Sequence, residues 1–456
     1  MKTYIIVGII LVALVALLAT NKKLVETLKN IYKIEELRQR ILFTLGLLLI
    51  YRLGSFVTLP GVDHSILEQW TQNFANDGSS LMGLLNIFSG GAFSHASIFA
   101  LGVMPYITAS IIIQLLGIMV PYFRKMQREG ESGRRKMNQW TRFLTIAVLL
   151  LQAPAYLATQ VISSGAVVAN GDFLGITNGQ FIVPAVIILI AGTMFIMWLG
   201  EKITDRGIGN GISLIIMIGI VARLPQSFLQ ELMFQTTGGG SIIMLLVELV
   251  FLALVFMLAI AIVQAVRKIP VQYAKRIVGN KQYGGVRQYI PLKLNAANVM
   301  PIIFAQALMF IPGLIWGGQW LDITSFWYNF TLVVLVIAFT YFYTAIIVNP
   351  QMMADDMKRN GGFIPGVKPG KSTVTYIDDI MTRITLPGSV FLAIITILPA
   401  IAMSLGITQG FAYFFGGTSL LIMVGVVLDT LKQIESYLLM RHYDGLMKTG
   451  RIQGRY

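Results

Sequence analysis

The chain has 456 residues, of which 55% are hydrophobic and 12% charged, and its formal net charge is +14. A soluble domain usually carries about 25% charged residues, so this composition excludes an ordinary soluble protein and predicts one that crosses a membrane repeatedly. Cysteine is absent and only three histidines are present. This excludes disulfides, thiolate metal sites and cysteine nucleophiles and argues against a histidine-rich metal site, so we expect no metal and no cofactor.

The N-terminus opens with an extra apolar segment, residues 1–20. Cleavage there as a signal peptide would export residues 22–40, which carry six Lys and Arg, so we predict an uncleaved anchor with its N-terminus outside. Within residues 21–40, the apolar side chains of 24–40 recur at helical spacing. They predict an amphipathic helix on the cytoplasmic membrane surface, with a solvated connector helix as the alternative.

Ten further apolar runs follow, and each is interpreted as a transmembrane helix. The fifth is short and is expected to stop at Arg223-Leu224-Pro225. The runs lie at 41–59, 94–118, 143–161, 181–200, 212–224, 241–266, 295–316, 328–349, 384–405 and 412–431.

Basic residues alternate from one side of these runs to the other. Alternate connecting segments hold 32 of the 35 Lys and Arg, and the intervening loops hold none. The three exceptions are Lys2, Arg52 and Arg223. Because cytoplasmic loops retain basic residues, both ends of the ten-span core, including the tail at 432–456, are predicted to lie in the cytoplasm.

The first outer loop, residues 60–93, contains the apolar stretch 79–91, which is too short to span a membrane and ends at Gly90-Gly91. An apolar half-helix is better placed re-entering a protein-lined cavity than exposed to water. A helix lying on the membrane surface is the alternative.

A short motif recurs five spans apart. Val103-Met104-Pro105 in the second span returns as Val299-Met300-Pro301 in the seventh, which runs in the opposite direction. This predicts an inverted repeat of two five-helix halves, residues 41–232 and 241–431. The two prolines are expected to interrupt their helices and to line a cavity.

Ionisable side chains within the spans are few. Glu248 is the clearest, with Arg223 as a possible partner, and Asp429 lies near a cytoplasmic end. No catalytic signature of a hydrolase, metalloprotease or nucleotide-binding enzyme is present. We therefore predict a protein that is not an enzyme.

Two cytoplasmic loops are longer than connectors need to be. Residues 267–294 place basic residues around Gly279-Asn280 and Gly284-Gly285, which is typical of a projecting hairpin. Residues 350–383 contain three Gly and Pro turns. Such basic loops can dock an acidic protein surface or an RNA backbone, although charge retention on the cytoplasmic side explains much of their composition.

At these motifs the sequence resembles the SecY family from about residue 24 to 450. The matching stretches are NIFSGGAFSHASIFALGVMPYITASIIIQLL (86–116), GESGRRK (130–136), GTMFIMWLGEKITDRGIGNGISL (192–214), YAKRIVG (273–279), FIPGVKPG (363–370) and GGTSLLI (416–422). The resemblance implies an all-α membrane protein of ten helices in two inverted halves around a central pore.

The resemblance also assigns roles to residues. An apolar pore ring would comprise Val103, Ile107, Ile212, Ile216, Ile303 and Ile422. A plug at about 79–93 would include Leu84, Asn86, Ile87, Phe88, Ser89, Gly90 and Gly91. A lateral gate to lipid would involve Thr108, Ile111, Gln114, Asn298 and Pro301. Motor or ribosome docking would use Lys275, Arg276 and Lys368.

The function implied is translocation of unfolded polypeptides across, and lateral insertion of spans into, a bacterial inner membrane. Implied partners are SecE-type and SecG-type small membrane subunits, the SecA motor ATPase, the ribosome, signal peptides, nascent chains and membrane lipids, but not DNA. A secondary transporter of a small solute is the alternative, although polar groups at mid-membrane are sparse. Three features depart from the family pattern. They are residues 1–20, Glu248, and Lys368, which stands at a position where the family usually has Arg.

Overall fold

A computed structural model describes residues 34–448, except 64, 68–85, 87–88, 168–177, 238–241, 274–275, 279–280, 284–286 and 317–323. The expected N-terminal anchor at 1–20 lies outside the described residues, as does most of the loop that holds the expected half-helix. The chain forms two compact units. One contains residues up to 240 and from 426 onward, and the other contains 241–425.

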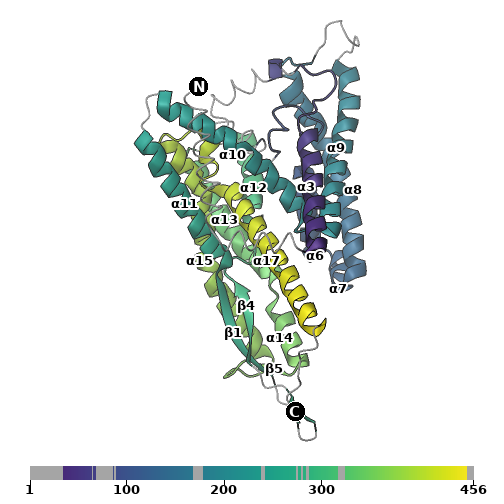
Figure 1. The fold of residues 1–456 in the computed structure, drawn as a ribbon, viewed down its shortest axis with the longest axis vertical. Coiled ribbons are helices and arrows are strands. Elements are labelled where there is room, and N and C mark those ends of the chain that lie inside the picture. The colour runs from purple at the N-terminus through teal and green to yellow at the C-terminus, as the bar shows by residue number, and fades with distance from the viewer. Residues whose placement is uncertain are drawn as a thin grey trace. The chain divides into compact units, whose positions relative to one another are not determined.

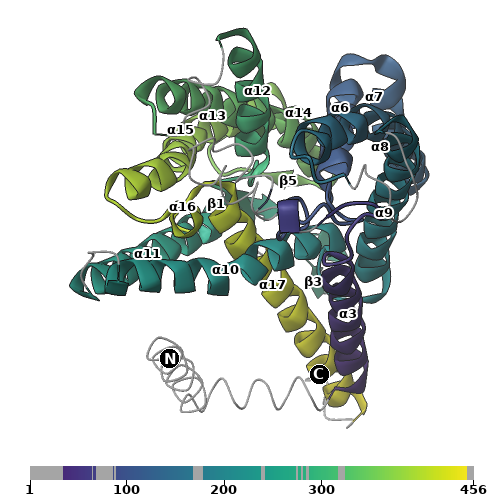
Figure 2. The same cartoon turned by 90° about the horizontal axis from the view of Figure 1, so that it is seen from above.

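The first unit is a bundle of helices. They are α3 (Glu35–Gly54), α6 (Met104–Met119), α7 (Pro121–Arg128), α8 (Glu131–Tyr156, extended by the π-helical turn Leu157–Ile162), α9 (Asn178–Arg206), α10 (Gly211–Thr237) and the later part of α17 (Gly417–Lys448). Helix α8 packs on α6 and α9, and α9 also packs on α3 and α10 (Figure 2).

The core of this unit lies where the turns at 92–101 meet α8 and α9. Phe93, Tyr156 and Leu189 are among its buried side chains. The backbone approach is close, because a Cβ at Gly192 of α9 would collide with the carbonyl oxygen of Ile98. Glycine is therefore required for these turns to lie directly against α9.

Three helix boundaries differ from the sequence-based expectation. Helix α3 begins at Glu35 and has no break at residue 40, so the described part of the expected surface helix is continuous with the helix of the expected first span. Helix α10 does not stop at Arg223–Pro225 but runs to Thr237. Glu231 and Leu232 beyond the proline are buried, so tertiary packing outweighs the local effect of one proline. Helix α17 continues to Lys448 through residues expected to form a tail.

The prediction that the two motif prolines interrupt their helices was wrong. Each is the second residue of its helix, α6 from Met104 and α12 from Met300. In the first turn of a helix, proline loses no hydrogen bond and its fixed φ suits the helix. The residues just before α6 form turns rather than an earlier part of the span.

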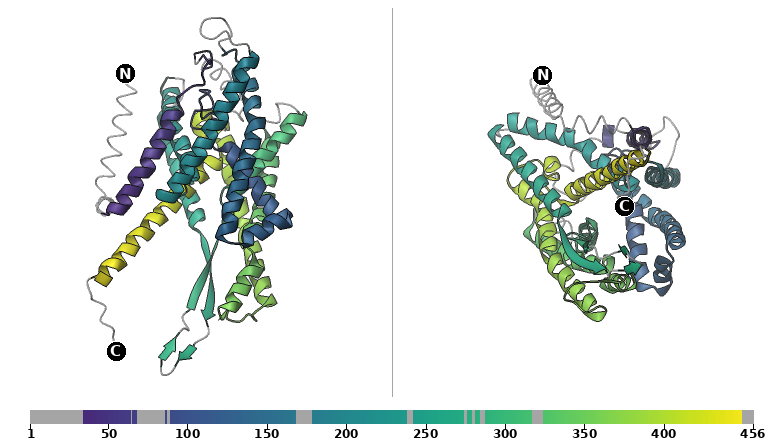
Figure 3. Two further views of the ribbon diagram at one scale, coloured as in Figure 1. Left: turned by 90° about the vertical axis from the view of Figure 1, so that its right-hand side faces the viewer. Right: turned by 60° about the horizontal axis from the view of Figure 1, so that its bottom comes forward.

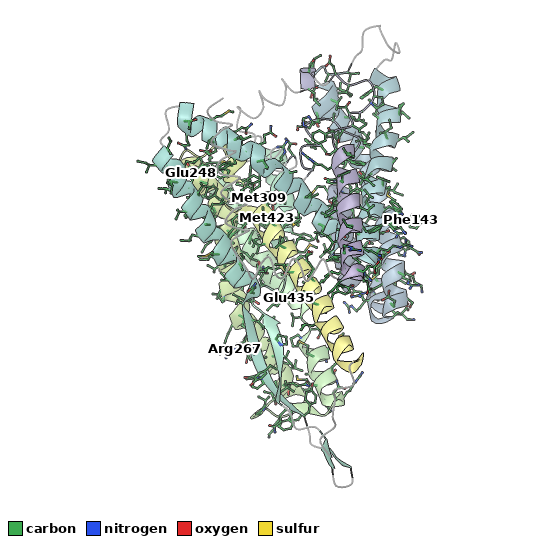
Figure 4. The ribbon with its side chains drawn as sticks, viewed as in Figure 1. Phe143, Glu248, Arg267, Met309, Met423 and Glu435 are labelled. Carbon is green, nitrogen blue, oxygen red and sulfur yellow. The ribbon has the colours of Figure 1, made fainter. Side chains whose placement is uncertain are left out.

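The second unit holds the remaining helices. They are α11 (Ile242–Gln264), α12 (Met300–Trp316), α13 (Phe326–Ile347), α14 (Pro350–Arg359), α15 (Lys371–Ser404), the short α16 (Gln409–Ala412) and the first part of α17. Helix α13 packs on both α12 and α15. Glu248 is one of the three buried residues of α11 (Figure 4), whose other large side chains are mostly exposed.

The predicted hairpin is present in this unit. Strand β1 (Val266–Tyr273) pairs antiparallel with β4 (Arg287–Lys293), in register from Val266↔Lys293 to Gln272↔Arg287. Strand β5 (Gly362–Phe363) adds to the other edge of β1. Beyond them, β2 (Arg276–Val278) pairs with β3 (Lys281–Tyr283) at the tip (Figures 1 and 3). The sheet buries Ile269, Val271 and Leu292 against α14 and α15.

The described residues are predominantly helical, as predicted. Seven of their helices are long and apolar enough to cross a membrane, or eight if α6 and α7, which meet at 100°, are counted as one bent span. This agrees with a polytopic membrane protein.

Candidate channel site

The segment that follows the expected half-helix is a compact series of turns. Gly90 and Gly91 have φ values of +65° and +95°, which side chains with a Cβ rarely adopt. The Gly91 N–H donates to Asn86 O (2.9 Å), and the Phe93 N–H donates to Ser89 Oγ (3.0 Å). Because Ser89, Gly90 and Gly91 are also buried, this part of the expected plug has a defined conformation. Leu84, Ile87 and Phe88 lie outside the described residues.

Two tyrosines attach these turns to neighbouring helices. Tyr51 of α3 donates to Ser89 O (3.4 Å), and Tyr156 of α8 donates to Phe93 O (2.7 Å). The rings of Phe93 and Tyr156 also pack with their centroids 4.8 Å apart. Each hydroxyl thus adds a second donor to a backbone carbonyl that otherwise accepts only a turn hydrogen bond, from Ala92 to Ser89 and from Ala96 to Phe93.

Two arginines meet the same turns. Arg52 Nη1 of α3 donates to Gly90 O (2.8 Å), and the guanidinium lies 4.6 Å from the Phe56 ring centroid. Arg223 Nη2 of α10 donates to Ser94 Oγ (3.4 Å). The sequence analysis assigned Arg52 no role and considered Arg223 only as a partner for Glu248. Both had nevertheless been exceptions in the charge distribution, and this was the signal that could have drawn attention to them.

Four of the six expected pore-ring residues belong to the first unit. Val103 is buried directly before α6, and the N–H of Ile107 donates to its carbonyl (3.0 Å). Ile212 and Ile216 lie one turn apart at the start of α10. Ile216 is buried, and Ile212 packs against Gly200 of α9. Two of these apolar side chains therefore lie at the start of α6, one of them in the residue before it, and two lie near the first turn of α10.

The start of α10 is fixed by side chains that accept hydrogen bonds from its preceding turn. Thr44 Oγ1 of α3 accepts from the Ile208 N–H (3.1 Å), and Gln433 Oε1 of α17 accepts from the Gly209 N–H (2.8 Å). Thr204 Oγ1 accepts from the Gly211 N–H (2.9 Å). Two of these acceptors bind N–H groups of the turn before α10, and Thr204 binds the first N–H of the helix, which has no partner within the helix. Together they fix the position at which α10 begins, next to Ile212. The sequence analysis did not identify Thr44 or Gln433.

The other two pore-ring residues belong to the second unit. Ile303 is partly buried near the start of α12, and Ile422 is buried in the first part of α17. Each is held within a packed helix of its own unit. Convergence of all six residues stays a prediction.

The expected lateral-gate residues also divide between the units. Thr108, Ile111 and Gln114 lie along α6, and Thr108 Oγ1 donates to Met104 O (3.1 Å). Asn298 and Pro301 flank the start of α12, where Asn298 adopts a φ of +52°. Asparagine tolerates this left-handed conformation better than most residues. The turn before α12 thus contains one residue, Asn298, in the left-handed conformation.

The expected docking residues lie on the hairpin and on a second loop of the same unit. Arg276 begins β2, whereas Lys275 lies outside the described residues. Lys368 is exposed among the turns before α15, where its carbonyl accepts a hydrogen bond from Thr373 Oγ1 (2.9 Å). The backbone at Lys368 is therefore held in place while its side chain is exposed, and both are needed for a residue that binds a partner.

The helices are long and apolar and contain few ionisable groups, and the buried turns are attached to three of them. These features together define a multi-spanning α-helical membrane protein. The SecY family model matches residues 97–431. The chain is 41% identical over 445 residues to the protein translocase subunit SecY of Corynebacterium glutamicum and 43% identical over 443 residues to that of Streptomyces scabiei. Each comparison covers 91% of this chain and 98% of the relative. The chain belongs to the SecY family, as its motifs predicted.

Solved structures show the same fold. One described as a protein-conducting channel superposes with a TM-score of 0.57 at 18% identity, covering 87% of this chain and 91% of the other. Sec61 in the canine ribosome–channel complex from the endoplasmic reticulum gives 0.53 at 16% identity, with the same coverage.

Proposed function

We propose that this chain is the channel-forming subunit of a protein translocase. It would conduct unfolded polypeptides across a bacterial inner membrane and release apolar segments sideways into lipid. The observation that carries the proposal is the identity of 41% to a protein translocase subunit across 91% of the chain. Likeness in fold to a protein-conducting channel supports it.

The proposed arrangement has ten spans in two inverted halves, 41–232 and 241–431, with an extra N-terminal anchor and both ends of the core in the cytoplasm. The branched side chains of the pore ring would offer a passing chain no specific partner and would keep the empty pore dry. The lateral gate would let each segment partition into lipid by its hydrophobicity. Neither step requires a catalytic residue or a cofactor, so the chain itself would not be an enzyme.

The proposed partners follow the same reasoning. Small SecE-type and SecG-type subunits would pack on the exposed apolar helices, while a SecA motor or a ribosome would bind the β1–β4 hairpin and the loop at Lys368. Sec61 and yeast Ssh1 have been solved bound to ribosomes, which supports a docking role for the corresponding surface. Signal peptides and nascent chains would enter between the gate helices.

Arrested export intermediates test the proposal. The chain has no native cysteine, so one photo-crosslinker or cysteine at Ile107 or Ile303 reports on a stalled polypeptide without background. Crosslinks at both positions, and none at the exposed lipid-facing Leu246 of α11, are expected. A solute transporter would give none at any position.

Deletion of residues 79–86 tests the plug separately. The resting channel should leak ions while export continues, because the seal is lost but the pathway remains. Unchanged conductance would favour a helix lying on the membrane surface.

A further inference from the structure

An ion pair joins α8 to α9 in the first unit. Arg142 Nε of α8 donates to Glu201 Oε1 of α9 (3.0 Å), and Arg142 Nη2 donates to Glu201 Oε2 (2.7 Å). One edge of the guanidinium therefore binds both oxygens of one carboxylate, which is the strongest geometry for such a pair. The pairs of Arg40, Arg135 and Lys136 differ, because each joins residues at most seven positions apart at 3.6 to 4.0 Å.

This pair lies next to the start of α10. Glu201 follows Gly200, and a Cβ at Gly200 would lie 2.8 Å from Cγ1 of Ile212, an expected pore-ring residue. A Cβ at Gly211, the first residue of α10, would collide with the Gly200 carbonyl oxygen. Because the two backbones are in contact, a displacement of α9 at Glu201 displaces the start of α10 as well.

The same pair lies near the start of α6. Tyr106, the residue before the expected pore-ring residue Ile107, is partly buried and is close enough to feel the charges of both Glu201 and Arg142. Helix α6 also packs along α8, which carries Arg142. The pair is therefore connected to one pore-ring position on α6 and to another on α10.

The pair adds little to the stability of the folded chain. The side chain of Arg142 is 46% exposed and that of Glu201 is 30% exposed, and water and salt screen an ion pair at that exposure. A bidentate pair nevertheless fixes the relative direction of its two groups. The main effect of this pair is therefore on the positions of α8 and α9.

We propose that the Arg142–Glu201 pair is a brace that sets the separation of Ile107 and Ile212, and so the width of the pore ring on the side of the first unit. The pair holds α8 to α9, while α6 packs on α8 and the start of α10 packs on α9. Arg142 and Glu201 are positioning residues, because they act on the ring through these helices. The inference rests on the proposed channel function.

Removal of either charge in the complete translocase tests the brace. Arg142→Gln and Glu201→Gln each lose the pair, and each should raise the resting ion leak by up to about fivefold, the ratio that corresponds to the upper end for an exposed ion pair. Arg142→Lys keeps the charge but loses the bidentate geometry, so its leak should lie between those of the parent chain and Arg142→Gln.

A charge swap separates the pair from its individual residues. Arg142→Glu alone places two carboxylates together and should leak more than Arg142→Gln. The double variant Arg142→Glu/Glu201→Arg rebuilds the pair with exchanged charges and should return the leak to within about twofold of the parent value. Arg135→Gln is the matched control on the same helix, because the Arg135–Glu131 pair is longer (4.0 Å) and more exposed. Its leak should equal that of the parent chain.

The Tm and the protein level distinguish positioning from folding. The two glutamine variants should accumulate and unfold like the parent chain while their leak rises. A lower Tm or protein level without a leak would assign the pair to folding alone and overturn the proposal, as would a parental leak in both variants or a leak that the charge swap does not reduce. If Ile107→Asn leaks in those cases, the channel function stands and only the brace fails.

Discussion

The backbone N–H of Gly209 donates a 2.8 Å hydrogen bond to Gln433 Oε1, joining residues 224 positions apart in sequence. Gly209 belongs to the turn between α9 and α10 and has a φ of +82°. Gln433 lies in the later part of α17, in the same compact unit. Four residues further along α17, the Tyr437 ring lies 5.2 Å from the Arg40 guanidinium of α3. The C-terminal helix is therefore attached to the turn that precedes α10, whose first residues include two of the expected pore-ring residues.

Replacing Gln433 tests this attachment. Gln433→Ala leaves the buried Gly209 N–H without an acceptor, which we expect to reduce the free energy of unfolding by about 1–3 kcal/mol. The Tm of the purified protein in detergent should fall accordingly. Gln433→Glu is the matched control, because its carboxylate can still accept from Gly209. Equal Tm values for the alanine and glutamate variants would mean that the bond contributes nothing.

A second prediction concerns the glycine at the close approach of the turns to α9. Gly192→Ala places a methyl group against Ile98 O, and we expect it to destabilise the protein by about 1–3 kcal/mol through overpacking. The control is Gly46→Ala in α3, where a Cβ meets nothing within 4 Å. That substitution should be stabilising by up to about 1 kcal/mol, because alanine favours helices over glycine. Thermal unfolding of both variants provides the comparison, and a neutral Gly192→Ala would contradict the packing described for 92–101.

The proposed topology can be measured with single cysteines. A cysteine at Asn138 or Lys281 should react with an impermeant thiol reagent only from the cytoplasmic side, and one at Asn73 or Asn178 only from outside. These positions lie in or beside expected loops, and the distribution of basic residues predicts on which side of the membrane each loop lies. Labelling of Asn178 from the cytoplasm would remove one of the ten proposed spans.

The features predicted correctly from sequence were those with a local signature. Apolar runs predicted long helices, seven or eight of which, among the described residues, are long and apolar enough to cross a membrane. The glycines at 279–285 predicted the β1–β4 hairpin. The continuation of α10 beyond Pro225 was missed because long-range packing determines it. The hydrogen bonds from Tyr51 and Tyr156 were missed for another reason, since their acceptors are backbone carbonyls of irregular turns. Such acceptors have no sequence pattern. The family resemblance pointed to Ser89, Gly90 and Gly91 of these turns, and the unexpected charge of Arg52 and Arg223 was the signal for the residues that contact them.

Lys368 is the basis of a prediction about motor coupling. Its side chain is exposed on a loop whose backbone is held by Thr373. If the charge alone serves the motor, Lys368→Arg should export normally and Lys368→Glu should block motor-driven export, because the reversed charge repels an acidic partner surface. Export rates in inverted membrane vesicles supplied with the motor provide the measurement. Equal rates for both variants would exclude an electrostatic role for this residue.

The pore ring gives the prediction that most sharply separates a channel from a packed bundle. Ile107 and Ile303 are both partly buried in this structure. In a packed core, Ile→Asn leaves an amide without partners at a cost of about 1–3 kcal/mol, so the protein should be lost or poorly assembled. At a pore constriction the same amide is hydrated, which admits water and weakens the closed state. We therefore expect Ile107→Asn and Ile303→Asn to accumulate normally, to leak ions and to export substrates with defective signal sequences.

Ile107→Leu and Ile303→Leu, which keep the apolar surface, should behave like the parent chain. Immunoblotting, conductance and reporter export together decide between the two, and low protein levels with neither leak nor relaxed specificity would place both residues in the core.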